Sequence, residues 1–288
     1  MTYYIAAYDT EMWNVSPFET RVPTCLEAAQ RIVEVHQRYQ MPATFFIVGQ
    51  ALESDPAGYR ALLDDPLFEI ASHTYSHKML RDHPFCGPAA SPGEIREEVY
   101  RGKDVVEQIF GRACRGMRTG CGFADGLRGS PELVEMLADA GYEYVSSRLW
   151  GPEYSLPCPL YQPFSYAAEG RPDLWELPGH GWHENLLKGH NRIFGMGALR
   201  VLLFPPLYPE AVPDGFISTP AEEFRWNNRV FMDHAISDSA LYVSLVWHPW
   251  SLAMFDPEMR MLELTFEYAR EQGLTPTTYA GLREVVGR

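Results

Sequence analysis

The sequence has little that would mark a membrane-spanning, exported or nucleic-acid-binding protein. No uninterrupted apolar run reaches the roughly 20 residues that a membrane helix needs. The amino terminus lacks the basic stretch that opens a signal peptide, so we expect a cytoplasmic location. Basic residues are few: 24 Lys and Arg against 38 Asp and Glu give a net charge of −14. That balance argues against a binding surface for nucleic acid or anionic lipid.

Cysteine is also sparse and is not arranged for cross-linking. The five cysteines are odd in number and widely spaced, and none form a C-x-x-C pair. Neither a disulfide framework nor a zinc–thiolate site is therefore indicated, and we expect free thiols. The chain has no internal repeat, low-complexity tract or linker, so one domain over residues 1–288 is the simplest prediction.

The sequence does contain an alternation of β-type apolar runs with segments of helical periodicity. Residues 43–48 form a continuous β-branched and aromatic run, typical of a parallel strand covered on both faces. A capping box at Ser91 and Glu94 opens a predicted helix that ends near Phe110. Residues 183–213 show no clear pattern and are a candidate lid. The alternation predicts a mostly parallel α/β sheet, with strands over residues 3–8, 43–48, 67–71, 112–117, 142–146, 174–178 and 241–247.

The most informative stretch is residues 72–77, which read Ser-His-Thr-Tyr-Ser-His. His73 and His77 are four residues apart, so a helical turn or a tightly wound loop brings both imidazoles to one side. Two imidazoles at this spacing can take adjacent corners of a metal site. The spacing alone is a weak signal, because most such pairs lie on solvated helix faces. The pair gains weight from its position directly after a predicted strand.

Other predicted strands also end in residues that can do chemistry. Asp9 and Glu11 follow the first strand, and because side chains alternate along an extended segment, both face one side while Thr10 faces away. Arg118 and His248 follow later strands. The carboxyl ends of parallel strands gather at one face of an α/β barrel. Two histidines and a carboxylate leave open positions on a divalent metal, and a second carboxylate and a further histidine supply a base and an acid for amide hydrolysis.

In order and spacing, five segments resemble the polysaccharide deacetylase (NodB-like) family. They are the acidic motif at residues 8–11, the strand at 43–49, the histidine pair at 72–77, Arg-Thr-Gly at 118–120 and Leu-Val-Trp-His-Pro at 245–249. These segments are spread over nearly the whole chain. The resemblance implies a distorted (β/α)-barrel with seven rather than eight strands.

The resemblance also implies roles for individual residues. Asp9 would be the general base and His248 the general acid, while Arg118 would pair with Asp9 and orient it. His73 and His77 would be metal ligands, completed by a carboxylate. The implied cofactor is one divalent metal ion, with zinc expected first and cobalt, nickel or manganese as alternatives.

The sequence departs from the family pattern at three points. An Asp-Thr-Glu run replaces the usual adjacent aspartates, and Glu11 is the natural substitute as metal ligand because it shares the face of Asp9. The arginine motif continues into Gly-Cys-Gly-Phe rather than into prolines and an aromatic residue, which predicts a reshaped substrate cleft. The acidic residue that tunes His248 is left open between Asp173 and Glu176.

Aromatic residues near these motifs are candidates for the walls of a sugar-binding cleft. We assign Trp182, Trp250 and Phe123 to the substrate site, although such residues are equally at home in a core. The histidines of the unassigned region are expected in loops or at the surface rather than as ligands: His180, His183 and His190.

Together these features predict a metal-dependent hydrolase that removes an acetyl group from an N-acetylated carbohydrate, with an O-acetylated one as the lesser choice. Because no export signal is recognised, we expect a soluble or carrier-linked N-acetyl sugar as the partner, with no nucleic acid and no membrane span. Two alternatives stay open: a hydrolase of another non-peptide C–N bond, such as a formamide or a cyclic ureide, and a catalytically silent carbohydrate-binding barrel. The sequence leaves the oligomeric state open.

Overall fold

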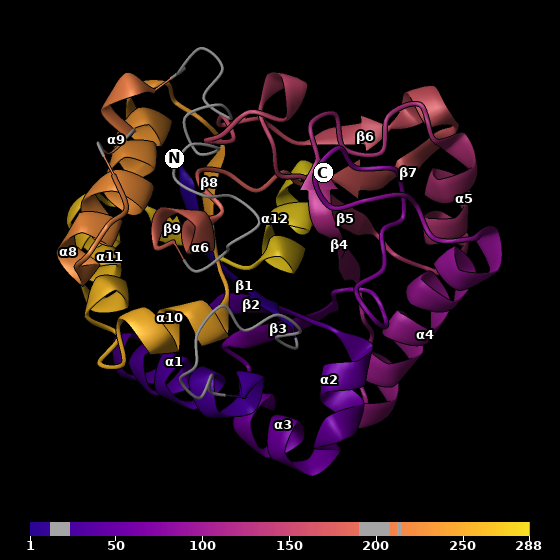
Figure 1. Cartoon of the computed structure of the whole chain (residues 1–288), viewed down its shortest axis with the longest axis horizontal. Coiled ribbons are helices and arrows are strands. Elements are labelled where there is room, and N and C mark those ends of the chain that lie inside the picture. The colour runs from indigo at the N-terminus through magenta and orange to yellow at the C-terminus, as the bar shows by residue number, and fades with distance from the viewer. Residues whose placement is uncertain (12–23, 190–207, 212, 214, 288) are drawn as a thin grey trace.

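The computed structural model describes residues 1–11, 24–189, 208–211, 213 and 215–287, and these build an α/β fold (Figure 1). Nine strands form one sheet in the order β6-β7-β5-β4-β3-β2-β1-β8, with β9 paired to β1. The neighbouring strands pair in parallel except for β6 and β7. The predicted mostly parallel fold is therefore confirmed. The strands are β1 (Tyr3–Thr10), β2 (Ala43–Ile47), β3 (Phe68–Ser72), β4 (Gly116–Phe123), β5 (Tyr144–Arg148), β6 (Phe164–Tyr166), β7 (Arg171–Glu176), β8 (Tyr242–Trp247) and β9 (Thr275–Pro276).

The two ends of this sheet approach each other. A parallel bridge joins His180, four residues after β7, to Leu245 of β8, and the His180 N–H donates to the Ser244 carbonyl oxygen at 3.0 Å. The ladders of the described residues do not close the sheet completely, but the bridge curves it toward a barrel. The arrangement is similar to the seven-stranded (β/α)-barrels that the resemblance implies, and it brings the carboxyl ends of the parallel strands together.

Most helices cover the outside of the sheet, whereas α12 lies on its inner side (Figure 1). Capping boxes at Thr24–Glu27 and Ser91–Glu94 begin two of the longest, which agrees with the start predicted at Ser91. Among the described residues, no helix is long and apolar enough to cross a membrane. The helices are α1 (Cys25–Tyr39), α2 (Gly49–Ser54), α3 (Pro56–Leu63), α4 (Pro92–Phe110), α5 (Pro131–Asp139), α6 (Glu184–Leu187), α8 (Pro220–Glu223), the π-helix η4 (Phe224–Arg229), α9 (Val230–Ser237), α10 (Pro249–Phe255), α11 (Arg260–Glu271) and α12 (Tyr279–Val286), with short 3-10 turns η1 (Pro152–Tyr154), η2 (Ala167–Glu169) and η3 (Pro209–Ala211).

The apolar core has two parts, one on each face of the curved sheet. Along β1, Tyr4, Ala6 and Tyr8 join the larger cluster between sheet and helices, whereas Ile5 and Ala7 join a smaller inner cluster. This alternation is the period of two that an extended strand imposes. The inner cluster also includes side chains from α12, which fill the inside of the sheet below the strand ends.

The fourth strand lies further along the chain than the predicted range 112–117, because β4 includes much of the glycine-rich run that follows it. Its pairing with β5 shifts register after Arg118, and Gly122 has a φ of 68°, a backbone conformation that glycine adopts readily. The irregular stretch brings the β4 backbone close to one of the candidate ligands. A Cβ atom on Gly120 would lie 3.3 Å from the His77 ring.

Candidate active site

β1 delivers two carboxylates to the inside of the sheet. Asp9 and Glu11 line the same pocket, as the two-residue period of the strand predicts. Thr10 between them is fully buried and is not part of the pocket wall. The alternation seen in the apolar part of β1 therefore continues into its polar end.

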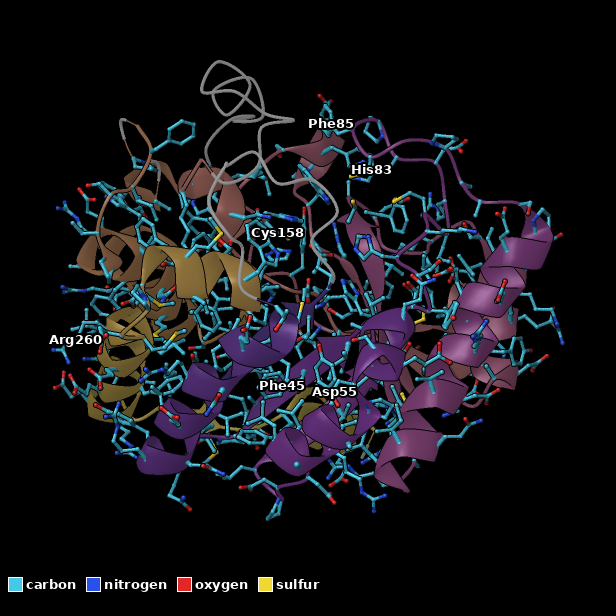
Figure 2. The ribbon with its side chains drawn as sticks, turned by 60° about the horizontal axis from the view of Figure 1, so that its bottom comes forward. Phe45, Asp55, His83, Phe85, Cys158 and Arg260 are labelled. Carbon is cyan, nitrogen blue, oxygen red and sulfur yellow. The ribbon has the colours of Figure 1, made fainter. Side chains whose placement is uncertain are left out.

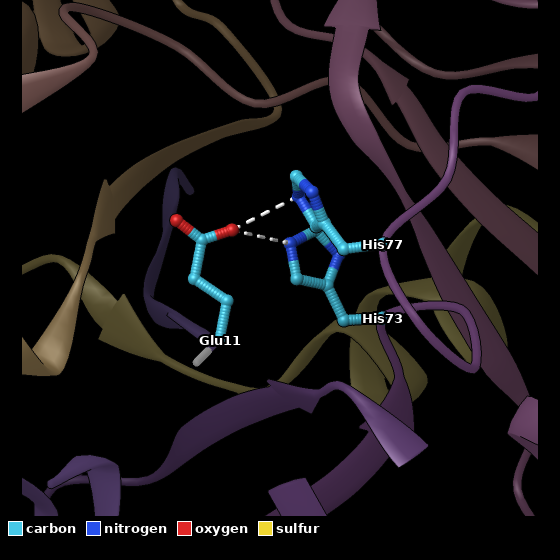
Figure 3. Close-up of side chains that lie close together, drawn as sticks. All are labelled: Glu11, His73 and His77. Atoms are coloured by element: carbon cyan, nitrogen blue, oxygen red, sulfur yellow. Dashed lines mark ion pairs between the residues drawn. The ribbon is translucent and has the colours of Figure 1, made fainter. Parts of the chain in front are cut away.

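Glu11 and the two histidines of residues 72–77 meet at this end of the sheet (Figure 3). The Oε2 atom of Glu11 lies 2.9 Å from Nε2 of His77 and 3.7 Å from Nε2 of His73. One donor atom from each residue falls within 4.8 Å of the other two. Two imidazoles and a carboxylate at such separations can hold zinc or a similar ion and leave positions for water or substrate. The residues present therefore fit the divalent metal that the resemblance implies.

Hydrogen bonds and charge prepare these residues for a cation. The Nδ1–H of His73 donates to the Arg118 carbonyl oxygen at 3.0 Å, which leaves Nε2 free on the side of Glu11. Burial would raise the pKa of Glu11, but His77 and its neighbours hold that pKa well below the usual range. Burial would lower the pKa of His77, but Glu11 outweighs burial and raises it to about 9. A metal ion that binds Glu11 and His77 would displace the proton that His77 carries.

The loop that carries the histidines is fixed by helix α4. Thr74 and His77 have positive φ angles of 63° and 64°, so a tight loop, not a helix, produces the four-residue spacing. Glu98 of α4 accepts hydrogen bonds from the Ser76 backbone N–H, at 2.8 Å, and from the Ser76 hydroxyl. One turn later, a Cβ atom on Gly102 would lie 2.8 Å from the Thr74 carbonyl carbon. The close approach of α4 thus sets the position of His77.

The predicted base is paired with a buried arginine. Nη1 of Arg118 lies 2.6 Å from Oδ1 of Asp9, and the side chains are 0% and 7% exposed. The guanidinium also donates to the hydroxyls of Tyr279, at 2.7 Å, and Ser146, at 3.1 Å, and its carbon lies 4.1 Å from the Phe46 ring centre. Burial would raise the pKa of Asp9, but Arg118 and nearby histidines outweigh burial and lower it. Asp9 is therefore ionised at neutral pH.

His248 is held by a residue that the sequence did not single out. Glu184, the first residue of α6, is fully buried. Its Oε1 atom accepts the His248 backbone N–H at 2.8 Å and lies 3.5 Å from Nδ1 of the ring. The other ring nitrogen lies 3.6 Å from Oε1 of Glu11. Burial would lower the pKa of His248, but Glu184 outweighs it and raises that pKa to about 9. The imidazole is therefore protonated at neutral pH, as a general acid requires.

A second buried ion pair lies behind Glu184. Nζ of Lys188 is 3.8 Å from Oε1 of Glu184 and 2.8 Å from Oε1 of Glu223, and all three side chains are 0% exposed. Burial would raise the pKa of Glu184, but Lys188 and His248 lower it to about 2. Burial raises the pKa of Glu223 to about 7 despite Lys188. A line of alternating charge thus leads from His248 into the protein interior.

The acidic partner of His248 is Glu184, which corrects the prediction of Asp173 or Glu176. Asp173 has a 62% exposed side chain that is paired with Arg171 at 3.0 Å. Glu176 is buried, but its carboxylate accepts hydrogen bonds from the hydroxyls of Ser147 and Tyr166. Both candidates therefore have other partners. The sequence signal for the real partner is an acidic residue four positions before Lys188, a pattern that is more typical of an exposed helix face.

The base, the acid and the three donor residues open into one pocket of about 530 Å³. Trp150 forms part of its wall and is fixed by an indole N–H that donates to the Cys121 carbonyl oxygen at 2.7 Å. The pocket is lined by Asp9, Glu11, His73, His77, Cys86, Cys121, Leu149, Trp150, His183, Asn185, Leu186 and His248.

The three aromatic residues assigned to substrate binding lie deeper than expected. Trp182 is 1% exposed and lines only a smaller adjoining hollow of about 270 Å³. Phe123 and Trp250 are fully buried and line neither cavity. The structure does not support stacking of these three rings on a sugar, because their faces are packed against other residues of the core. The aromatic side chain that does line the pocket is Trp150, and the 39% exposed Phe85 packs beside it with ring centroids 5.8 Å apart (Figure 2 labels Phe85).

The first two histidines after β7 lie in the connection between β7 and α6, as the loop expectation allows, but they are not exposed on the surface. His180 is 2% exposed; its Nδ1 accepts the Ser244 N–H and its Nε2 donates to the Tyr161 carbonyl oxygen at 2.8 Å. His183 lines the pocket. His190 and most of the candidate lid lie outside the described residues, so the lid remains a prediction.

Comparison with known proteins agrees with these motifs. The family model described as polysaccharide deacetylase matches residues 20–145, a range that contains β2, β3 and β4 with His73, His77 and Arg118. The resemblance to the polysaccharide deacetylases is confirmed. No curated protein matches the chain. The family match supports a hydrolase that acts on a C–N bond other than a peptide bond.

Solved structures extend the likeness beyond the matched range. The Puue allantoinase has a TM-score of 0.63 at 13% identity, covering 98% of this chain and 88% of that one. A probable polysaccharide deacetylase from Pseudomonas aeruginosa PAO1 has a TM-score of 0.61 at 15% identity, covering 98% and 89%. A CE4 family pseudoenzyme from Bacillus anthracis has a TM-score of 0.50 at 12% identity, covering 98% and 65%. At such identities these likenesses establish the fold alone.

Proposed function

We propose that this polysaccharide deacetylase-like protein is a metal-dependent hydrolase that removes an acetyl group from an N-acetylated carbohydrate. The observation that carries the proposal is one pocket lined by both Asp9, which is paired with Arg118, and His248, which is held by Glu184. Asp9 is ionised because Arg118 lowers its pKa, and His248 is protonated because Glu184 raises its pKa. Titratable groups pushed apart in this way are suited to act as base and acid at the same pH.

Glu11, His73 and His77 would hold the metal between these two groups. When bound, a divalent ion supplies Lewis acidity there and lowers the pKa of water. Zinc suits the two imidazoles and one carboxylate, with cobalt, nickel or manganese as alternatives. A cytoplasmic location, and a soluble or carrier-linked N-acetyl sugar as the substrate, are parts of this proposal.

The residues of the chain divide the proton transfers between them. Asp9, oriented by Arg118, accepts a proton from the attacking water. His248 gives a proton to the nitrogen of the amide as the C–N bond breaks, so the amine leaves neutral. Acetate and a free amino sugar are the products.

The test is the metal content of the purified protein, measured by elemental analysis beside acetate release from N-acetyl sugars. We expect close to one divalent ion per chain, lost in His73→Ala and Glu11→Ala because each removes one of three donors. His248→Ala should keep the metal while kcat falls by about 10²- to 10⁴-fold, the usual contribution of a general acid. His234→Ala is the control, because this partly exposed histidine pairs with Glu210 away from the pocket.

A folded wild-type protein that neither contains nor takes up a divalent ion would overturn the proposal. If the wild-type protein binds metal and releases no acetate, but hydrolyses a formamide or a cyclic ureide, the substrate is one of these compounds and not an N-acetyl sugar. Metal binding with no turnover of any of these compounds, and retained affinity for an N-acetyl sugar, would indicate a silent carbohydrate-binding barrel.

A further inference from the structure

His183 occupies a position that the base, the acid and the metal donors leave unexplained. It lines the main pocket and also the adjoining hollow of about 270 Å³. Four residues border both cavities, and two of them are the base and the acid: Asp9, Leu149, His183 and His248. None of the three metal donors borders the smaller hollow. His183 therefore lies on the side of the pocket that faces the acid rather than on the metal side.

The orientation and tautomer of the His183 ring are fixed by two contacts. Nε2 lies 3.2 Å from the Leu149 carbonyl oxygen, and because a carbonyl can only accept, Nε2 carries the hydrogen. The ring packs on Trp150 with centroids 4.7 Å apart and planes at 38°. Burial lowers the pKa of His183 to about 4, so the ring is neutral at neutral pH. Nδ1 is then a hydrogen-bond acceptor, and it has no partner among the described residues.

Asn185, two residues after His183, also lacks a hydrogen-bond partner for its side-chain oxygen in the described part of the chain. Its side chain lines the main pocket and is 6% exposed, yet this Oδ1 atom is buried. Glu184 between them points the other way, toward His248. The start of α6 thus presents two polar groups to the pocket that protein contacts leave unsatisfied. Buried polar groups of this kind normally have a partner, and here the pocket is where a ligand would supply it.

We propose that His183 is a substrate-binding residue whose Nδ1 accepts a hydrogen bond from the N–H of the scissile amide. The inference rests on the proposed function. His248 must protonate the amide nitrogen on one side, so the existing N–H points elsewhere and needs an acceptor. Asp9 is committed to Arg118 and to the attacking water. Of the two neutral acceptors, His183 and Asn185, only His183 borders both cavities together with His248, so we assign the N–H to His183. The proton on that nitrogen stays in place throughout, so C–N cleavage remains balanced.

This contact makes His183 a specificity residue for amides over esters. An ester oxygen has no hydrogen to donate, so a bound O-acetyl group would displace water from Nδ1 without replacing its hydrogen bond. An acceptor left desolvated and unpaired in the complex costs about 1–3 kcal/mol, or roughly 5- to 150-fold in kcat/KM. The wild-type protein should therefore prefer an N-acetyl substrate to the matching O-acetyl one.

The test compares His183→Phe with His183→Asn on a matched pair of substrates, a 2-acetamido-2-deoxyglucoside and the 2-O-acetyl glucoside with the same aglycone. Phenylalanine keeps a ring on Trp150 but has no acceptor, whereas asparagine can place an oxygen near the position of Nδ1. We expect His183→Phe to lower kcat/KM on the amide by about 10- to 100-fold and to change kcat/KM on the ester little. His183→Asn should recover part of the amide preference. Metal content should not change in either variant.

An equal loss on both substrates in His183→Phe, with His234→Ala as active as wild type, would overturn the inference and leave the proposed function intact. An amide preference unchanged in His183→Phe would overturn it as well. A wild-type protein that releases acetate from neither compound would instead count against the proposed function. Thermal melting checks that each variant is folded, and His183→Leu, which also lacks an acceptor, stands in if His183→Phe is not.

Discussion

The base and the acid are each held by a buried group of opposite charge, but the two supports differ in origin. Asp9 and its partner Arg118 both belong to strands, β1 and β4, and their charged atoms are 2.6 Å apart. His248 follows β8, whereas its partner Glu184 belongs to the four-residue helix α6, and the ring lies 3.5 Å from that carboxylate. The sheet therefore fixes the base directly, while the acid depends on a short connecting segment.

The two supports also end differently. Behind Asp9, the Arg118 guanidinium is completed by neutral hydroxyls of Tyr279 and Ser146 and by the Phe46 ring. Behind His248, charge alternates further through Lys188 to a second carboxylate. The base side is thus a single charge pair with neutral surroundings, and the acid side is a chain of charges in which each member depends on the next. Removing one member should accordingly have a larger effect on stability at the base side and a more specific effect on pH dependence at the acid side.

The largest effect should follow from Arg118→Met, which leaves Asp9 buried without its cation. Breaking a buried pair by removing one partner typically costs about 3–5 kcal/mol of folding free energy, measurable by denaturant unfolding. Without Arg118, burial raises the pKa of Asp9, so the acidic limb of the kcat/KM profile should move to higher pH. Arg31→Met is the control, because its pair with Glu34 is 62% and 54% exposed. That change should stay within about 0.5 kcal/mol. Equal stability losses in the two variants would contradict the distinction.

Glu184→Gln should have a smaller effect on stability and a sharper one on pH dependence. Glutamine keeps an oxygen that can accept the His248 backbone N–H, but it removes the charge that raises the His248 pKa to about 9. The alkaline limb of kcat/KM, which reports a protonated acid, should therefore move to lower pH. An alkaline limb that stays in place would show that Glu184 does not tune His248.

The stability of Glu184→Gln relative to wild type should also vary with pH. The lowered pKa of Glu184, about 2 against 4.5, stabilises the fold above pH 4.5, and that contribution is lost as pH falls toward 2. The raised pKa of His248, about 9 against 6.5, stabilises the fold below pH 6.5, and that contribution is lost as pH rises toward 9. Both contributions are complete between pH 4.5 and 6.5, so the difference between variant and wild type should be largest there.

This comparison also explains how much of the site the sequence could predict. In the sequence, Asp9, Glu11, Arg118 and His248 all follow predicted strands, and the period of two places the first two on one face. The closing approach of the sheet ends then brings them together. The local sequence pattern and the strand topology are therefore enough to predict this part of the site.

The remainder depends on a segment with no such pattern. α6 has only four residues, too few for helical periodicity to be recognised. Its position is set by tertiary contacts, such as the bond from the His248 N–H to Glu184 and the bridge between His180 and Leu245. The same reason accounts for the misplaced tryptophans, since aromatic residues at a cleft and in a core look alike in sequence. Asp173, one of the two candidates, directly precedes the strand predicted at 174–178, but in the structure it stands near the start of β7, away from the carboxyl end of that strand.

The smallest effect should follow from Asp173→Asn, which tests that explanation. The Asp173 side chain is 62% exposed and shares Arg171 with Asp139, so the arginine keeps a partner at 2.8 Å when the charge is removed. An exposed pair of this kind contributes about 0–1 kcal/mol, and unfolding in denaturant should show a loss of no more than about 0.5 kcal/mol. The kcat/KM profile should match wild type, measured in parallel with Glu184→Gln. If the alkaline limb shifts as far in Asp173→Asn as in Glu184→Gln, Asp173 of β7 also raises the His248 pKa. That result would contradict the assignment of this role to Glu184 of α6 alone.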